Sequence, residues 1–214
     1  MRIKFIVSRY DESVQWLEPI MNEVIIYNKG TRLNFVNEIC RVNVGRETEN
    51  ILEYIIQNYE NMPDILIFSQ GCIEDHIPVN ISEIDYLQKI KEEAIQFGKS
   101  RNYFVNEWSK ETIYEGSFSP CFNIFPTKKG KEKFNRINQN YHKFCSFKKW
   151  FEKKVQTEYP NPFFYYRNSL FAVQKNKVLK HTKNYYVNLQ KYVNHHIDPI
   201  EGHFLERSWW YIFL

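Results

Sequence analysis

The side chains best suited to chemistry lie in four short polar segments that interrupt apolar stretches of the sequence. The first segment, residues 8–12, includes Arg9, Tyr10 and Asp11. An aromatic ring can stack on a flat heterocycle, and a carboxylate can accept hydrogen bonds from hydroxyl groups. The segment therefore predicts either a binding site for a nucleoside or a solvated loop in which Asp11 or Ser13 caps the following segment.

The second segment, residues 43–47, places Gly45 and Arg46 at the start of a predicted helix. Glycine allows the backbone to approach a ligand closely, and a helix N-terminus offers free N–H groups to an anion. A cation at this position opposes the helix dipole unless it meets an anion. We therefore expect Arg46 either to bind a phosphate or to pair with a nearby acidic side chain.

The third segment follows a predicted strand and contains Gln70, Asp75 and His76. A carboxylate and an imidazole at a strand end are suitable ligands for a divalent cation, Mn²⁺ or Mg²⁺, that bridges a diphosphate. The segment therefore predicts a metal site at Asp75 and His76. The competing interpretation is that these two residues form a simple turn.

The fourth segment, residues 201–207, contains His203 and Glu206 on a strongly apolar terminal helix. Trp210 and Phe213 follow Glu206 on the same side of that helix, one and two turns later. A carboxylate on an apolar face needs a partner or a chemical task. Glu206 is therefore a candidate general base, with His203 as a second catalytic candidate; the alternative is a buried pair between Glu206 and an arginine.

Three apolar runs predict the strands that position these segments, over residues 4–7, 23–27 and 64–68. An amphipathic helix over residues 49–60 separates the second run from the third, which indicates a parallel crossover unit. Ligands bind outside the carboxyl ends of such strands. We therefore expect the residues that end the runs, Asn28 and Lys29 among them, to lie at one edge of the sheet.

The remaining patterns predict a single α/β domain over residues 1–214, with a central, mostly parallel sheet flanked by helices. No internal repeat or linker divides the chain. Residues 100–128 are expected to be irregular. The other expected elements are helices over residues 83–97, 130–155, 182–193 and 201–213, and strands over 163–166 and 169–173.

Composition places weaker limits on function. The chain has 43% hydrophobic residues and a net charge of +4, which is typical of a globular protein and does not by itself indicate nucleic acid. The basic excess in residues 128–154 predicts a solvated helical face, or a contact surface for phosphates or an acidic acceptor. No signal peptide or membrane span is predicted. The cysteines lack zinc spacing and predict buried, reduced thiols in a cytoplasmic protein: Cys40, Cys72, Cys121 and Cys145.

Phosphate-binding motifs of the dinucleotide and P-loop types are absent from the sequence, as are the GxSxG and HExxH motifs. Residues 7–12, 27–30, 43–47 and 68–71 resemble a family of uncharacterised function whose members carry patterns like VARYNE, YNKG, NxGRE and FxQG. The segment from Phe171 to His181 resembles a strand–turn segment of GT-A glycosyltransferases. Residues 201–207 resemble the GFLxER ending of a capsule-type glycosyltransferase family. The resemblance covers nearly the whole chain, except residues 77–160.

The resemblance implies a GT-A fold that transfers a sugar from a nucleotide-diphosphate donor, such as a UDP-sugar, to a hydroxyl of a glycan or glycoconjugate. It places the catalytic base at Glu206, with His203 nearby, in an acceptor half over residues 160–214. The donor half, residues 1–76, would bind the nucleotide-sugar through Arg9, Tyr10, Asp11, Asn28, Lys29, Gly45, Arg46 and Gln70.

This sequence departs from the resemblance at the metal-binding DxD motif, which residues 69–71 replace with Ser-Gln-Gly. Either Asp75 and His76 substitute for it, or Lys29 and Arg46 neutralise the diphosphate without metal. The missing motif also supports a rival hypothesis, a non-catalytic nucleotide- or glycan-binding module. A third hypothesis, nucleic-acid binding by residues 128–154, is disfavoured because it leaves the four polar segments without a purpose.

Overall fold

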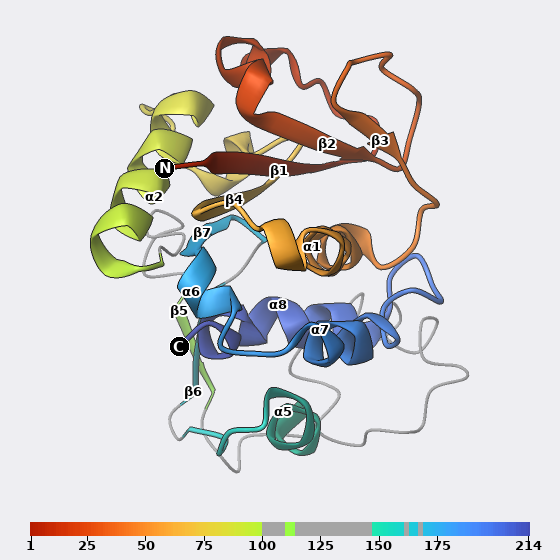
Figure 1. The fold of residues 1–214 in the computed structure, drawn as a ribbon, viewed down its shortest axis with the longest axis vertical. Helices are drawn as coiled ribbons and strands as arrows, with labels where there is room; N and C mark the ends of the chain where they lie inside the picture. The colour runs from red at the N-terminus through yellow and green to blue at the C-terminus, as the bar shows by residue number, and fades with distance from the viewer. Residues whose placement is uncertain (100–109, 114–146, 161–162, 167–168) are drawn as a thin grey trace.

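The computed structural model describes residues 1–99, 110–113, 147–160, 163–166 and 169–214. A five-stranded sheet in the order β3-β2-β1-β4-β7 lies at the centre (Figure 1). β1 (Ile3–Arg9) pairs in parallel with β2 (Val24–Asn28) and β4 (Ile65–Gln70), and β3 (Glu38–Cys40) extends the parallel arrangement beyond β2. β7 (Phe171–Gln174) pairs antiparallel with β4. The predicted α/β class with a mostly parallel sheet is therefore confirmed.

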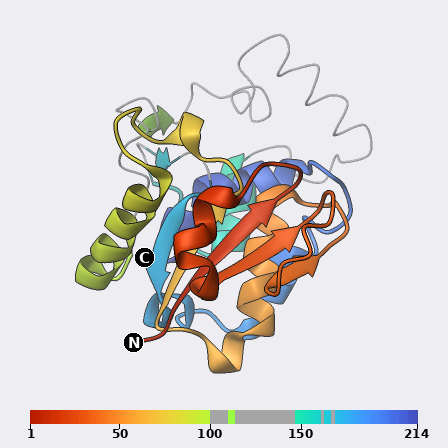
Figure 2. The ribbon, with the colours of Figure 1, turned by 90° about the horizontal axis from the view of Figure 1, so that it is seen from above.

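Side chains alternate across this sheet and build a separate apolar core on each face. Ile6 and Phe68 point into one core, which includes the buried faces of α1 (Arg46–Gln57), α5 (Phe147–Val155), α7 (Lys183–Gln190) and α8 (Ile200–Ile212). Phe5 and Ile67 point into the other core, beneath α2 (Glu83–Phe97) and η1 (Gln15–Glu23). The period of two along each strand explains this division. Helices thus cover both faces of the sheet (Figures 1 and 2).

The parallel register brings the carboxyl ends of three strands together. Ser8 lies opposite Tyr27 on β2 and opposite Gln70 on β4. One residue later, Arg9 lies opposite Asn28. The polar segments that follow β1, β2 and β4 therefore leave the sheet at the same edge, as the crossover pattern predicted.

The remaining elements are short. They are η2 (Tyr59–Asn61), η3 (Glu74–His76) and α6 (Lys175–Val178), with a small second sheet of β5 (Lys110–Ile113) and β6 (Phe163–Tyr166). Among the predicted elements, the helix at 83–97 and the strand at 163–166 match α2 and β6. α7 and α8 confirm the two later helices within a few residues.

Several predictions were wrong or incomplete. β3 was missed because a three-residue edge strand is too short to show a period of two. β5 interrupts residues expected to be irregular, and only residues 147–155 of the predicted basic helix belong to the described chain. Cys40 and Cys72 are exposed rather than buried, because one lies on the edge strand β3 and the other lies in the loop after β4. Cys121 and Cys145 lie outside the described residues.

Candidate functional site

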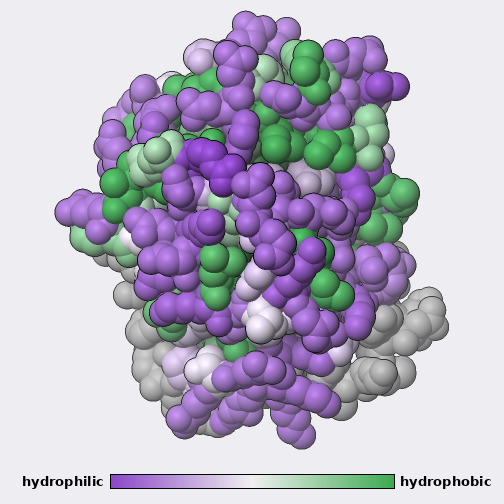
Figure 3. Space-filling model, viewed as in Figure 1, coloured by the Kyte–Doolittle hydropathy of each residue, from purple (hydrophilic) through white to green (hydrophobic). Residues whose placement is uncertain are grey.

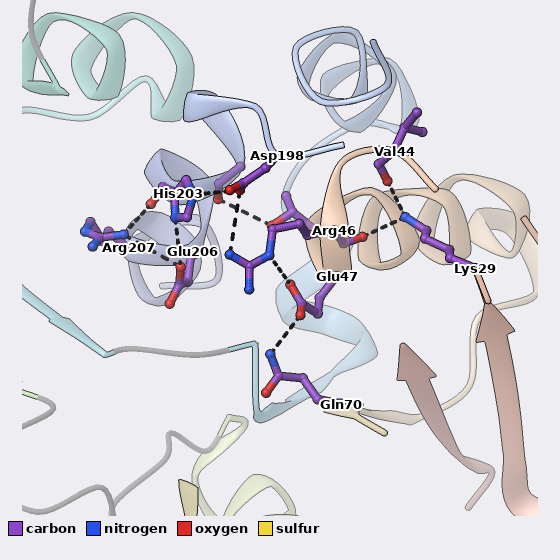
Figure 4. Close-up of polar contacts among 11 residues, drawn as sticks. Lys29, Val44, Arg46, Glu47, Gln70, Asp198, His203, Glu206 and Arg207 are labelled. Atoms are coloured by element: carbon purple, nitrogen blue, oxygen red, sulfur yellow. Dashed lines mark hydrogen bonds and ion pairs between the residues drawn. The ribbon is translucent and has the colours of Figure 1, made fainter. Parts of the chain in front are cut away.

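The start of α1 and the first turns of α8 enclose a small polar cavity beside the carboxyl end of β4. Its volume is about 10 Å³, room for about one water molecule. Both the second and the fourth polar segments contribute to its lining, and Ser169 adds to it from the residues before β7. We call the charged residues gathered here the helix-junction cluster: Arg46, Glu47, Asp198, His203 and Glu206 (Figure 4).

The backbone of Arg46 has an unusual, left-handed conformation. Gly45 and Arg46 both have positive φ, 64° and 49°. A Cβ atom at Gly45 would lie 2.4 Å from the carbonyl oxygen of Val193, so glycine is required there. A non-glycine residue such as Arg46 in the left-handed region costs about 1–2 kcal/mol, and such outliers concentrate at functional sites. The strain places Arg46 at the first turn of α1, whose opening N–H groups have no intrahelical partners.

Arg46 and the adjacent Glu47 together contact two distant parts of the chain, the loop before α8 and the end of β4. The guanidinium of Arg46 lies 3.5 Å from a carboxylate oxygen of Glu47 and 3.6 Å from one of Asp198. Gln70, at the end of β4, donates a hydrogen bond of 2.9 Å to Glu47. Burial lowers the pKa of Arg46, but Glu47, Asp198 and Glu206 outweigh that effect and raise it. The expected pairing of Arg46 with a nearby acid is therefore present, yet 45% of its side chain remains exposed.

His203 sits between two carboxylates. Its Nε2 atom lies 2.8 Å from Asp198, and its Nδ1 atom lies 3.8 Å from Glu206. Burial lowers the pKa of His203, but the interactions with Asp198 and Glu206 exceed that effect, so the net shift is upward. The two carboxylates thus favour the protonated, positively charged form of the His203 imidazole.

Glu206 lines the same cavity, and 22% of its side chain is exposed. Arg207 lies 3.7 Å from its carboxylate and donates a hydrogen bond of 2.9 Å to the carbonyl of His203. The expected pair between Glu206 and an arginine is thus present only as a long contact, and the Glu206 carboxylate still faces the cavity. A carboxylate that borders a water-sized space is placed to accept a proton from a hydroxyl group.

A model of a protein family described as "Protein of unknown function (DUF3431)" matches residues 5–214. The chain belongs to the DUF3431 family. The match extends from β1 to the end of α8, so the whole helix-junction cluster lies inside the region that defines the family. No curated protein and no solved structure matches the chain. Within the parts of the chain described above, no helix has the length and apolar character needed to cross a membrane.

In this DUF3431 protein, Lys29 supports Arg46 rather than reaching the cavity. Its ammonium group donates hydrogen bonds to the carbonyl oxygens of Val44 and Arg46, and lies 3.1 Å from Glu49. Only 4% of the Lys29 side chain is exposed. Burial lowers its pKa, and Glu49 offsets part of that effect. Lys29 therefore fixes the carbonyls on both sides of Gly45 and so holds the strained turn in place.

Arg9 and Asn28 are committed to the backbone in a similar way. The Arg9 guanidinium donates to the side-chain oxygen of Asn28 at 2.8 Å and to the carbonyl of Thr31 at 2.7 Å. Asn28 also donates to Thr31. We call Arg9, Asn28 and Lys29 the strand-end cluster. Arg9 and Asn28 tie together the loops after β1 and β2, and Lys29 holds the turn before α1. The donor-binding hypothesis had expected these three side chains to turn toward a ligand.

Two other predicted donor-binding residues, Tyr10 and Asp11, are both exposed but differ in their contacts. The ring of Tyr10 is half-exposed, at 52% of its surface, and remains a candidate stacking surface. Asp11 is exposed, but its carboxylate accepts a hydrogen bond of 2.8 Å from the backbone N–H of Thr31. That bond lowers the pKa of Asp11. Asp11 therefore closes the loop after β1 onto the loop after β2, rather than capping the segment that follows it.

Asp75 and His76 form a pair on η3, with 3.4 Å between the imidazole and the carboxylate. Three quarters of the Asp75 side chain is exposed. In the portion of the chain that the structure describes, no group of three or more His, Cys, Asp or Glu residues is arranged to hold a metal ion. The metal site at Asp75 and His76 stays a prediction, and two donors alone supply few of the ligands that a divalent cation takes.

Asp198 was not predicted, although it contacts both Arg46 and His203. It lies in the loop between α7 and α8, immediately before the Pro199 that precedes α8. The sequence signal was present, because an acid directly before a proline and a helix marks a turn whose side chain is available near the helix start. Glu47 was not predicted as an individual site residue either, because the sequence shows it only as part of the segment at the start of the predicted helix.

Proposed function

We propose that this protein transfers a glycosyl group from a nucleotide-diphosphate sugar to a hydroxyl of a glycan or glycoconjugate. One observation carries the proposal: residues from three of the four polar segments meet in a single charged cluster. Arg46 and Glu47 come from the second segment, Gln70 from the third, and His203 with Glu206 from the fourth. The resemblance of residues 201–207 to the ending of a capsule-type glycosyltransferase family supports the same reaction.

Glu206 is the group that would accept the acceptor's proton. As the hydroxyl proton passes to Glu206, the hydroxyl oxygen forms a bond to the anomeric carbon of the donor sugar. The bond from that carbon to the diphosphate breaks, and the nucleoside diphosphate leaves with the bonding electrons. This assignment applies to transfer with inversion of configuration, where one base acts on the attacking hydroxyl.

Arg46 and the N-terminus of α1 are the groups that would stabilise the leaving diphosphate. A guanidinium recognises phosphate oxygens through paired N–H donors, and helix N-termini attract anions. Arg46 is half-exposed, so it can exchange part of its pairing with Glu47 and Asp198 for a phosphate. The cavity admits about one water molecule, at about 10 Å³, so the reacting hydroxyl fits there and the nucleotide has to lie along the edge outside it.

Asp198 and His203 are positioning residues in this scheme. Asp198 holds Nε2 of His203, which directs Nδ1 toward Glu206. A divalent cation is implied by the resemblance, and it would supply positive charge to the diphosphate. Asp75 and His76 do not fit that task by themselves, because they offer two ligands, of which one is largely exposed. The proposal therefore assigns charge neutralisation to Arg46.

The test is Glu206→Gln, measured for donor binding by calorimetry and for turnover with a panel of nucleotide sugars. Glutamine retains the size of the side chain but cannot accept a proton. We expect turnover to fall by about 10²–10⁴ while donor affinity and melting temperature stay near wild type. A variant that turns over normally contradicts the proposed base. A variant that melts early and loses binding and turnover together indicates that Glu206 is structural.

A non-catalytic nucleotide- or glycan-binding module is the second candidate function. The observation in its favour is Gln70, which stands within the segment that replaces the DxD motif and is occupied by a hydrogen bond to Glu47. This hypothesis expects wild-type protein to bind a nucleotide sugar without consuming it in the presence of any acceptor. The same calorimetric and turnover measurements on the unaltered chain separate the two functions.

A further inference from the structure

A basic groove lies between α5 and α7, on the side of the chain that carries α8 rather than α2. Its volume is about 510 Å³, within the range of roughly 300–1,000 Å³ that is usual for small-ligand sites. Three lysines and three side-chain amides contribute to the lining, and no Asp or Glu of the described chain does: Lys153, Lys154, Lys191, Gln156, Asn184 and Asn188. The face over α7 and α5 is largely hydrophilic (Figure 3).

The positive charge of this groove extends through both helices. Residues 171–197 contain five lysines and no Asp or Glu, and α5 contains four lysines against Glu152. On α1, which packs against α7, Glu53 accepts a hydrogen bond of 2.8 Å from Gln190 and pairs with Arg41. A concave surface lined by charges of one sign raises the local concentration of ions of the opposite sign.

The groove is held together by a contact between its two walls. Lys154 of α5 donates a hydrogen bond to the hydroxyl of Tyr192, and its ammonium group lies 4.3 Å from the centre of that ring. Lys191 donates a hydrogen bond of 2.9 Å to Asn188, which orients both side chains. Lys153 is exposed beside them. The site therefore combines oriented cations with amide donors and acceptors.

We infer that this groove binds an acidic oligosaccharide, through carboxylate, sulfate or phosphate groups on the lysines and hydroxyl groups on the amides. That this oligosaccharide is the acceptor rests on the proposed function. That the groove binds it does not depend on that function. Single-stranded nucleic acid is a poorer fit, because sites for it offer open aromatic faces on which the bases stack. Here Lys154 covers the ring of Tyr192, and the ring of Tyr185 is stacked on His181 with 4.0 Å between centres.

Calorimetric titration with a tetrasaccharide of alternating glucuronate and N-acetylglucosamine tests the inference, with neutral chitotetraose as the matched ligand. We expect the acidic tetrasaccharide to bind and the neutral one to bind much more weakly, and the difference to shrink at high salt. The double variant Lys153→Gln/Lys191→Gln should bind the acidic ligand about tenfold more weakly, the combined effect of two partly exposed charge pairs. The control variant Lys89→Gln/Lys91→Gln removes two positive charges from α2, on the opposite face of the sheet. It should bind the acidic tetrasaccharide like wild type.

Three results overturn the inference. They are equal affinity for the acidic and neutral tetrasaccharides, unchanged affinity in the groove variant, and tighter binding of a single-stranded oligonucleotide that the same variant abolishes. Glu206→Gln separates this site from the proposed reaction, because it should retain wild-type affinity for the acidic tetrasaccharide. If wild-type protein binds that ligand but consumes no nucleotide sugar, the groove stands as a binding site and the proposed transfer fails.

Discussion

The strand-end cluster and the helix-junction cluster use similar residue types in opposite ways. In the strand-end cluster, Arg9, Asn28 and Lys29 are each less than a tenth exposed. Their donors are taken by carbonyl, amide and carboxylate oxygens of nearby segments. In the helix-junction cluster, charged side chains face one another, and Arg46 keeps 45% of its surface exposed. The first arrangement fixes the backbone, and the second presents charge to a cavity.

This difference shows that position at a strand end does not by itself make a polar residue available to a ligand. Lys29 and Arg46 are both cations beside the same turn, and Lys29 donates to the carbonyl of Arg46 itself. The buried cation thus holds the exposed one in its strained conformation. A ligand-binding residue needs this kind of support, because the arrangement must exist before the ligand arrives.

Lys29→Met has the largest expected effect and tests the structural half of the comparison. It leaves the Glu49 carboxylate buried without one of its cations, which costs on the order of 3–5 kcal/mol of unfolding free energy in comparable pairs. Equilibrium unfolding in urea measures the loss. The double variant Lys29→Met/Glu49→Leu should recover much of it, because both charges are then absent. A single variant as stable as wild type would mean that Lys29 is not a structural lock.

The fold could be predicted in large part from the sequence, whereas the site could be predicted only in outline. Strand cores at β1, β2 and β4 appear as apolar runs, and Glu206 stands out as a carboxylate on an apolar helix. Lys29 points inward because it bonds to the carbonyls of Val44 and Arg46, and these two groups come together only in the folded turn. The role of Asp198 depends on a contact with Arg46 across most of the chain. Periodicity carries no information on such contacts.

The buried carboxyl group of Glu201, on α8, sharpens the comparison through the effect of pH on stability. Glu201 is 2% exposed, and its Oε2 atom has no hydrogen-bond partner among the residues that the structure describes. Burial raises the pKa of Glu201 from 4.5 to about 7. Between these values the unfolded chain has released the proton that the folded chain retains, so unfolding free energy falls as pH rises and then levels off.

The expected loss between pH 4.5 and about 7 is roughly 3 kcal/mol, from the size of that shift. Urea unfolding across this pH range measures it. Glu201→Gln has no proton to release and should show a flatter profile, with greater stability than wild type above pH 7. Glu152→Gln, on the exposed side of α5, should retain the wild-type slope. Equal slopes in wild type and Glu201→Gln would show that this carboxyl does not titrate on unfolding.

Arg46→Gly has the smallest expected effect on stability, and it tests the functional half of the comparison. Glycine adopts the φ of 49° without strain, which favours the folded state. The lost contacts with Glu47 and Asp198 are long, at 3.5 and 3.6 Å, and involve a guanidinium that is 45% exposed, so they contribute little. We expect unfolding free energy to stay within about 1 kcal/mol of wild type. Donor affinity should nevertheless fall by about tenfold or more, because a charged contact to the diphosphate is removed.

Asn34→Gly provides the matched control, since Asn34 has a φ of 62° and lies in an exposed loop before β3. The same relief of backbone strain there should leave donor affinity unchanged. If Arg46→Gly keeps its unfolding free energy but loses donor affinity, and Asn34→Gly keeps both, the strained turn at Arg46 serves ligand binding. Backbone strain that does not stabilise the fold persists where function requires it. If Arg46→Gly instead loses as much stability as Lys29→Met and keeps its affinity, the two clusters are both structural, and the comparison that supports the proposed site no longer holds.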